Sequence, residues 1–340
     1  MAISPGIDPA SALQFVINGA AGSNDADTKR AVIEAALRSA GRRADLFFSH
    51  PADLAQTAQQ AATRAKANRT AVIAVGGDGT LNTVAQAAHT VGCAMGVVPQ
   101  GTFNYFARTH GIPSDPAEAV RRLLDWAPWP VQAAAVNDRV FLVNASVGLY
   151  PDLLEDREAY KARFGRSRWV ALWAACTTLL RAQRRLRLHI EQGAVTRDVS
   201  TLTLFVGNNR LQLEQLGVQP PLQAQSDVVR SFGMGLITAV MLRPIGTLSM
   251  VRLMLHGAMG SLGEAQSVER FEFEHMVVRP TLVPGRRRVK VAFDGEVTRM
   301  RAPLDFRVLS KPLYLLMPSP QAEPVAATVD PPTSQTSADT

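Results

Sequence analysis

The 340-residue chain has little of what builds disulfide frameworks or zinc sites. It contains two cysteines, Cys93 and Cys176, and neither belongs to a Cys-x-x-Cys pair. Both have mostly apolar neighbours, which favours buried, reduced thiols in an intracellular protein. The six histidines are scattered without metal-ligand spacing, so the sequence predicts no zinc site.

Long apolar runs are missing as well. No uninterrupted apolar stretch reaches the roughly 18 residues of a membrane-spanning helix, and no basic segment followed by an apolar core opens the chain. We therefore expect a cytoplasmic protein without a signal peptide. A further hypothesis is that it attaches peripherally to the inner face of the membrane. Residues 319–340 are rich in Pro, Ser, Thr and Ala without periodicity, which predicts a disordered tail.

Charged residues make up 19% of the chain, and their formal net charge is +7. A basic balance suits nucleic acid, an anionic membrane or a phosphorylated ligand. The four Tyr and four Trp residues are not interleaved with basic residues as a stacking platform, so nucleic-acid binding is disfavoured.

Two segments concentrate the positive charge. Residues 157–187 contain nine Lys or Arg around the apolar run WVALWAACTTLL. This pattern fits a buried helix with solvated basic ends, or a surface that associates peripherally with an anionic membrane. The second segment, GRRRVK at 285–290, is compatible with phosphate, membrane or solvent contacts.

The first third of the chain alternates strand-like and helix-like patterns. Strands are predicted at 13–18, 44–49, 70–75 and 94–99, and helices at 27–39, 51–68 and 81–89, with Pro51 in a first helical turn. Alternation of this kind predicts a parallel sheet, whose ligands lie beyond the carboxyl ends of the strands. Gly-rich turns follow the first, third and fourth strands at those ends.

After Trp126 the pattern changes. The sequence APWP at 127–130 indicates a linker, and the segments that follow alternate apolar and polar residues as antiparallel strands do. A helical insertion is predicted at about 151–183. Residues 312–318 are expected to return to the first domain.

The turn GGDGT at 76–80 joins a predicted strand to a predicted helix. Glycines let backbone N–H groups approach an anion, and the helix offers its positive end. Thr80 can add a hydroxyl and Asn82 an amide. The spacing excludes a P-loop and the standard dinucleotide fingerprint. Taken alone, the turn is equally compatible with a tight connection in which Asp78 caps the helix.

A second turn, PQGTFN at 99–104, is expected beside the first, since the two follow neighbouring strands. Together GGDGTLN and VPQGTFNYFARTHGIP resemble the catalytic domain of the diacylglycerol kinase and sphingosine kinase superfamily, and especially its bacterial lipid kinases. FLVNASVGLYPDLL, LFVGNN and FDGE match family blocks in the same order, so the resemblance covers about residues 13–317.

The resemblance implies ATP as phosphoryl donor, with Mg²⁺. It implies nucleotide contacts from Asn18, Gly22, Ser49, Gly76, Gly77, Asp78, Gly79, Thr80, Leu81, Asn82, Gly101, Thr102 and Asn104. Gly19 replaces the proline that is usual in the first nucleotide turn. Asp78 is expected near Mg²⁺, through water, so that the metal lies between its carboxylate and the phosphates.

The motif FDGE supplies two candidate catalytic acids, Asp294 and Glu296. Composition alone predicts that the motif is a hairpin turn. Its place in the family order implies instead that one of the two acids is the base that accepts the proton of the lipid hydroxyl. We favour Glu296. Met234 and Thr238 stand where the family has aspartates, which argues against its second, structural Mg²⁺ site.

We therefore predict a chain of α/β plus β class. Residues 1–127, with a return at about 309–318, are expected to form a nucleotide-binding domain like that of NAD kinases and phosphofructokinases, and residues 128–308 a β-rich lipid-substrate domain. The predicted function is ATP-dependent phosphorylation of a hydroxyl of a membrane lipid, diacylglycerol-like or sphingoid. An NAD-kinase-like enzyme, or a non-catalytic binding protein of the same fold, are the alternatives. The sequence does not decide whether the protein forms a homodimer.

Overall fold

The structure is a computed structural model that describes residues 4–19, 23–152, 186–208, 235–243, 268–281 and 287–318, without the side chains of 23–29. Several predictions fall outside the described residues: the tail 319–340, Gly22, Cys176, Met234 and nearly all of the basic segment 157–187. Cys93 is described, and it is a free, buried thiol as predicted.

The first sheet is built mainly from parallel strands. In spatial order it consists of β2 (Ala44–Ser49), β1 (Leu13–Asn18), β3 (Ala71–Gly76), β4 (Ala94–Pro99), β18 (Leu313–Met317) and β5 (Ala127–Val131). The first five are parallel, and β5 runs antiparallel to β18. The prediction of a linker at 127–130 is wrong, because these residues pair with β18 as strand β5.

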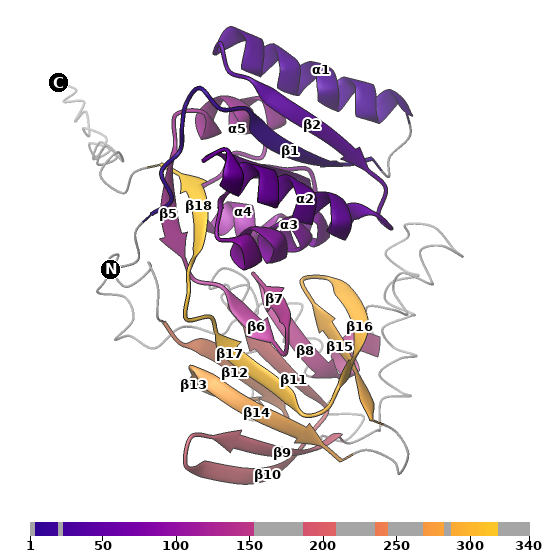
Figure 1. Cartoon of the computed structure of the whole chain (residues 1–340). Helices are drawn as coiled ribbons and strands as arrows, with labels where there is room; N and C mark the ends of the chain where they lie inside the picture. The colour runs from indigo at the N-terminus through magenta and orange to yellow at the C-terminus, as the bar shows by residue number, and fades with distance from the viewer. Residues whose placement is uncertain are drawn as a thin grey trace, which may run out of the picture.

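Five helices accompany this sheet: α1 (Ser23–Ser39), α2 (Leu54–Ala67), α3 (Asp78–Val91), α4 (Tyr105–Thr109) and α5 (Pro116–Leu123). Helices α2 and α3 pack side by side against β1 and β3, and α1 and α5 lie together on the other side of the sheet (Figure 1). The expectation for Pro51 is wrong, since α2 begins at Leu54 and Pro51 precedes it in a turn.

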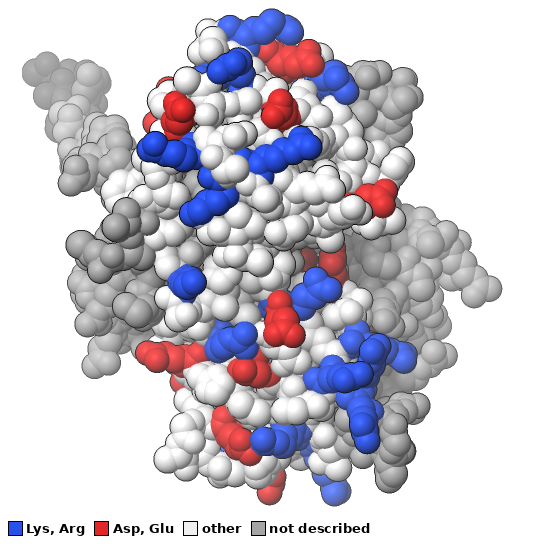
Figure 2. All heavy atoms as spheres, viewed as in Figure 1, with Lys and Arg blue, Asp and Glu red and all other residues white. Residues whose placement is uncertain are grey.

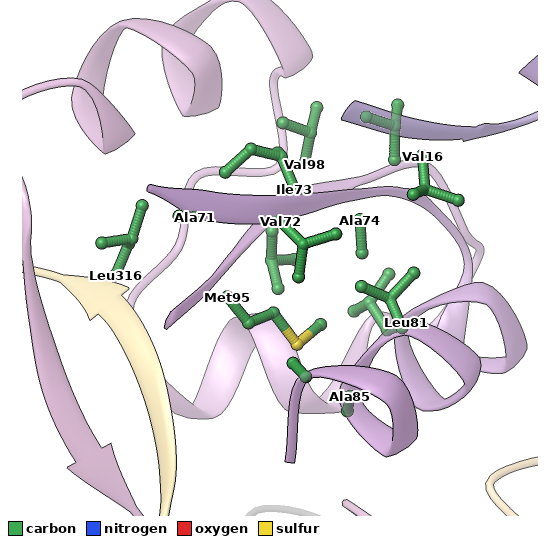
Figure 3. Packing of buried hydrophobic residues seen from close by; sticks show 14 of the residues in the cluster. Val16, Ala71, Val72, Ile73, Ala74, Leu81, Ala85, Met95, Val98 and Leu316 are labelled. Carbon is green, nitrogen blue, oxygen red and sulfur yellow. The ribbon is translucent and has the colours of Figure 1, made fainter. Parts of the chain in front are cut away.

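The core of this part is formed by two strands that are buried along their whole length, β3 and β4. Continuous apolar runs such as AVIAV suit a parallel sheet covered on both faces. Figure 3 shows Val72 and Met95 on the side of the sheet where Leu81 and Ala85 of α3 pack. This packing fixes the carboxyl end of β3 against the start of α3, where the first glycine turn lies.

The remaining strands form two antiparallel sheets. One has the order β10 (Val195–Thr201), β9 (Leu186–Gln192), β14 (His275–Pro280), β17 (Leu304–Val308), β6 (Ala134–Val136) and β7 (Arg139–Phe141). The other has the order β13 (Val268–Phe273), β12 (Ile237–Leu242), β11 (Thr203–Gly207), β8 (Asn144–Gly148), β15 (Arg288–Phe293) and β16 (Glu296–Arg301). A separate apolar cluster joins residues of both sheets.

The two parts of the molecule lie one above the other in Figure 1, with α3 facing β7 at their junction. The chain passes from the first sheet at β5 to the antiparallel part at β6, and returns from β17 to β18. Within the described residues, no helix combines the length and the apolar character needed to cross a membrane.

Candidate active site

The first glycine turn connects β3 to α3. Gly77 is the extended residue before the helix, and Leu81 N–H donates to Gly77 O at 3.0 Å. A Cβ on Gly76 would lie 2.6 Å from Oγ1 of Thr80, so the turn needs glycine there because the threonine folds back over it. The first turn of a helix presents backbone N–H groups that have no intrahelical partner, and these suit an anion.

The second turn follows β4 and is closed by one side chain. Asn104 has a left-handed backbone (φ 48°), which asparagine tolerates better than most residues. Its Oδ1 accepts from Gly101 N–H at 2.9 Å, and its Nδ2 donates to Gly101 O at 2.9 Å. This ring of contacts leaves Thr102 and Phe103 exposed at the tip of the turn.

The two turns touch. A Cβ on Gly101 would lie 2.8 Å from the Cα of Gly77, and Gln100 N–H donates to Gly76 O at 2.8 Å. The prediction that they lie side by side is therefore confirmed. Glycine is required at this contact because any side chain would push the turns apart.

Asp78 ties the two turns together. Its carboxylate accepts backbone hydrogen bonds from Asn104 and Tyr105, at the start of α4. Burial raises the pKa of this carboxyl, and the two hydrogen bonds lower it. The other oxygen, Oδ1, is buried and has no hydrogen-bond partner in the described part of the chain. Asp78 is thus a structural link with one carboxylate oxygen left over.

That leftover oxygen fits the predicted place of Asp78 near Mg²⁺, with water between them. Mg²⁺ is held by one or two carboxylates together with waters and substrate phosphates, so a single protein oxygen is enough. The described residues contain no group of three or more His, Cys, Asp or Glu that would form an all-protein metal site. Asp78 Oδ1 therefore fits a metal that arrives with its phosphates.

The FDGE motif forms the turn of the β15–β16 hairpin. Asp294 and Gly295 both have positive φ, 45° and 87°, as the two central residues of the preferred two-residue hairpin turn require. The turn points toward α3 in Figure 1. The hairpin that composition predicts is therefore present at these residues, and the catalytic site that the family order implies there stays a prediction.

Asp294 is 5% exposed, and its carboxylate accepts four hydrogen bonds. The donors are Leu142 N at 2.7 Å, Val143 N at 2.8 Å, Asn144 N at 3.0 Å and Asn82 Nδ2 at 2.7 Å. Burial raises the pKa of Asp294 to about 6, and these hydrogen bonds lower it. Each oxygen already accepts two donors, so Asp294 anchors the hairpin and is poorly placed to accept a substrate proton.

Asn82 and Leu81, which the resemblance places among the nucleotide contacts, are both engaged within the protein. Asn82 Nδ2 donates to Asp294 and, at 2.7 Å, to Val140 O, which uses both amide hydrogens. The Leu81 side chain is fully buried in the core, and its N–H is engaged inside the helix. Both side chains fix the position of α3 and leave no donor for a phosphate.

Glu296 lies directly opposite the first glycine turn. A Cβ on Gly79 would be 2.7 Å from Oε1 of Glu296, so the carboxylate rests against the glycine. The residue is exposed, but partial burial of the carboxyl raises its pKa, while the charge of Arg139 lowers it. Glu296 is therefore the acid of FDGE that faces the predicted phosphate site.

The first nucleotide turn contributes at the edge of the site. Asn18 Nδ2 donates to Thr80 Oγ1 at 3.2 Å, which joins the end of β1 to the GGDGT turn. Ser49, at the end of β2, is 5% exposed. Its hydroxyl contacts His50 O and Thr57 Oγ1, both at 3.1 Å. The structure thus brings Asn18 to the glycine turn and directs Ser49 toward α2.

Two contributions were missed by reasoning from the sequence. Arg139, on β7, acts on Glu296, and the backbone of residues 142–144 holds Asp294. The block FLVNASVG marked this region as part of the family pattern. It gave no sign that the contribution comes from main-chain N–H groups, because these carry no residue identity.

Comparisons with known proteins agree with this geometry. Residues 12–136 match the family model described as the diacylglycerol kinase catalytic domain. A Klebsiella pneumoniae protein described as a probable lipid kinase, YegS-like, is 40% identical over 98 residues, 28% of this chain and 33% of that protein. A Pseudomonas putida protein with the same description is 35% identical over 136 residues, 39% of this chain and 44% of that protein. The matches thus span less than half the length of these curated relatives.

A crystal structure described as a diacylglycerol kinase from Bacillus anthracis matches the fold with a TM-score of 0.63. The match covers 91% of this chain and 98% of that chain at 19% identity. At this identity the likeness shows the fold. It confirms the predicted combination of a parallel α/β part with an antiparallel β-rich part.

Proposed function

We propose that the protein is an ATP-dependent lipid kinase, because residues 12–136 match the family model described as the diacylglycerol kinase catalytic domain. It transfers the γ-phosphoryl group of ATP to a hydroxyl of a membrane lipid. Diacylglycerol-like and sphingoid alcohols both fit this proposal.

The observation that carries the proposal is the contact between Glu296 and Gly79. The glycine belongs to a turn suited to phosphate, and the carboxylate comes from the other part of the molecule. A base must lie within hydrogen-bond reach of the proton it accepts. A hydroxyl bound beside Glu296 at the glycine turn would meet this condition and face a phosphoryl group in the turn.

The reaction follows from these positions. The lipid hydroxyl oxygen forms a bond to the γ-phosphorus, the bond from that phosphorus to the β–γ bridging oxygen breaks, and ADP leaves. The hydroxyl proton passes to the carboxylate of Glu296. The backbone N–H groups at the start of α3 and the Thr80 hydroxyl orient the phosphates, which is the main protein contribution to phosphoryl transfer.

Mg²⁺ fits beside Asp78 Oδ1, where it would neutralise charge on the phosphates. Asp78 itself has a second task, because its backbone hydrogen bonds hold the GTFN turn against the GGDGT turn. A carboxylate at this point in an anion-binding turn is then explained by one oxygen that organises the loops and one that would be left for the metal.

The test is a transfer assay with γ-labelled ATP, offered a total lipid extract in detergent micelles and, in parallel, NAD. We expect label in the lipid fraction with wild type and its loss with Glu296→Gln. Glu274→Gln is a matched control, because Glu274 is an exposed acid between β13 and β14. Label in NAD would instead support an NAD-kinase-like enzyme, and no label in either acceptor would support a non-catalytic binding protein.

A further inference from the structure

The β15–β16 hairpin carries a row of cations on one face. Its register places Arg288 directly opposite Arg301, and Lys290 directly opposite Arg299. Directly opposite residues of an antiparallel pair project to the same face. We call these four residues the cationic ladder. Arg288, Arg299 and Arg301 are exposed, and Lys290 pairs with Asp152 at 2.6 Å.

Like charges placed directly opposite each other destabilise a strand pair. Several other cations of the antiparallel part have acidic partners: Arg279 with Glu191, Arg307 with Asp305 at 3.0 Å, and Arg197 with Glu269 at 2.7 Å. Across the described ranges, the three ladder arginines have no such partner. The arrangement therefore does not serve the stability of the sheet.

The ladder is also a concentrated surface feature. Figure 2 shows Lys and Arg side chains gathered on the lower right of the molecule, where Figure 1 places the hairpin. The hairpin is at the edge of its sheet, and the remaining pair in the same alternation, Ala292 opposite Val297, carries no charge. A face with four cations and no aromatic residue suits a planar anionic surface better than stacked bases.

We propose that the cationic ladder docks the protein on the anionic surface of a phospholipid bilayer. The proposal deepens the lipid kinase function, on which it rests. Glu296 begins the strand that carries Arg299 and Arg301, so these cations lie roughly 10 to 17 Å along the strand from the carboxylate. Docking through the ladder holds the site next to the head groups, while Glu296 itself faces the opposite side of the hairpin.

The test measures sedimentation of the full chain with phosphatidylcholine vesicles, with and without phosphatidylglycerol, in the absence of nucleotide. The test variant combines Arg288→Gln, Arg299→Gln and Arg301→Gln. The matched control combines Arg38→Gln, Arg121→Gln and Arg122→Gln, which remove equal charge from α1 and α5 at the far end of the molecule (Figure 1). Because each basic residue near an anionic surface adds a similar increment, the test variant should bind on the order of a hundred-fold more weakly.

Wild type and the control should bind only the vesicles that contain phosphatidylglycerol, and added salt should weaken the binding. Equal binding by the test variant and wild type would overturn the proposal. So would duplex DNA that competes with the vesicles and binds more tightly at the same ionic strength. A single Arg301→Glu variant guards against misfolding, since it should raise the melting temperature by relieving a like-charge pair and yet weaken vesicle binding.

The same proteins are then assayed for phosphoryl transfer to lipid in neutral detergent micelles, which present no anionic bilayer. Unchanged transfer by the ladder variant, with lost vesicle binding, separates docking from catalysis. If wild type binds the vesicles as expected but transfers no phosphate to any lipid, the kinase proposal fails and the docking surface stands. If transfer occurs and vesicle binding does not depend on the ladder, the docking proposal fails alone.

Discussion

The amide of Asn82 donates a 2.7 Å hydrogen bond to the carboxylate of Asp294, which lies 212 positions later in the chain. Asn82 stands near the start of α3, just after the GGDGT turn, and Asp294 in the hairpin that carries Glu296. This bond therefore links the predicted phosphate site to the predicted base. It joins the two parts of the molecule where their relative position matters for transfer.

A double-mutant cycle measures this link. We expect Asp294→Ala to lower the free energy of unfolding by about 3–5 kcal/mol, because three backbone N–H groups and the Asn82 amide lose their acceptor in a buried site. Asn82→Ala should cost about 1–3 kcal/mol. Denaturant unfolding of both variants and of the double variant gives a coupling energy, which we expect between about 0.5 and 3 kcal/mol.

Additive effects would contradict a direct link. Glu274→Ala with Asn82→Ala is the control pair, since Glu274 is exposed and lies between β13 and β14. Transfer activity should fall with Asp294→Ala even at temperatures where the variant is folded, because the hairpin that positions Glu296 loses its anchor.

Asp294 also predicts a pH dependence of stability. Its folded pKa of about 6 is above the ordinary value of 3.8, so the folded state holds the proton more tightly than the unfolded state. The resulting stabilisation is complete below about pH 4 and is lost as the pH rises through 6. Its size is on the order of 3 kcal/mol. The unfolding free energy of wild type minus that of Asp294→Ala should fall over this window, and a flat difference would contradict the assignment.

Much of the first part could be predicted from the sequence, because local patterns determine it. The runs at 13–18, 44–49 and 94–99 became parallel strands with those bounds, since short apolar runs between turns predict strands. The contact of the two glycine turns followed from neighbouring strand ends. APWP was misjudged because prolines favour loops, while on β5, an edge strand, they are tolerated.

The different roles of the two acids of FDGE could not be predicted from local sequence patterns. Asp294 and Glu296 are two residues apart, and composition treats them alike. Their difference comes from long-range contacts, since the loop before β8 surrounds one and Gly79 faces the other. The same holds for Asn82, since an amide near a glycine turn resembles a phosphate donor until its partners across the junction are known.

Glu296→Gln should lower kcat by about 10²–10⁴-fold with little effect on stability, which is the usual contribution of a general base. A base must be ionised, so the rate of wild type should rise with pH through a limb above the ordinary glutamate value of 4.5. Arg139 lowers the pKa of Glu296, and Arg139→Gln should therefore move the limb to higher pH. A pH–rate profile of kcat checks both points, and a limb that shifts downward or does not move would contradict the role of Arg139.

Asp78→Asn separates the two tasks of that carboxylate. The amide oxygen can still accept from Asn104 and Tyr105, so we expect thermal unfolding close to that of wild type. Its nitrogen cannot replace Oδ1 as a metal ligand, so transfer should fall about 10²-fold or more. The apparent Mg²⁺ requirement, measured by titration in the transfer assay, should rise in parallel. A folded variant with normal turnover at low Mg²⁺ would remove Asp78 from the metal site.

Gly79→Ala tests the contact between the glycine turn and Glu296 with one methyl group. Gly79 lies in the first turn of α3 without a left-handed backbone, so alanine should be neutral or stabilising by up to about 1 kcal/mol. The methyl would approach Glu296 Oε1 to 2.7 Å, and the flexible acid would move away. A displacement of about 1 Å at a reacting group costs up to about 10²-fold in rate, so kcat should fall by that order while the melting temperature holds or rises. Thr90→Ala, at an exposed position of the same helix, should change neither, and unchanged kcat in Gly79→Ala would show that the base lies elsewhere.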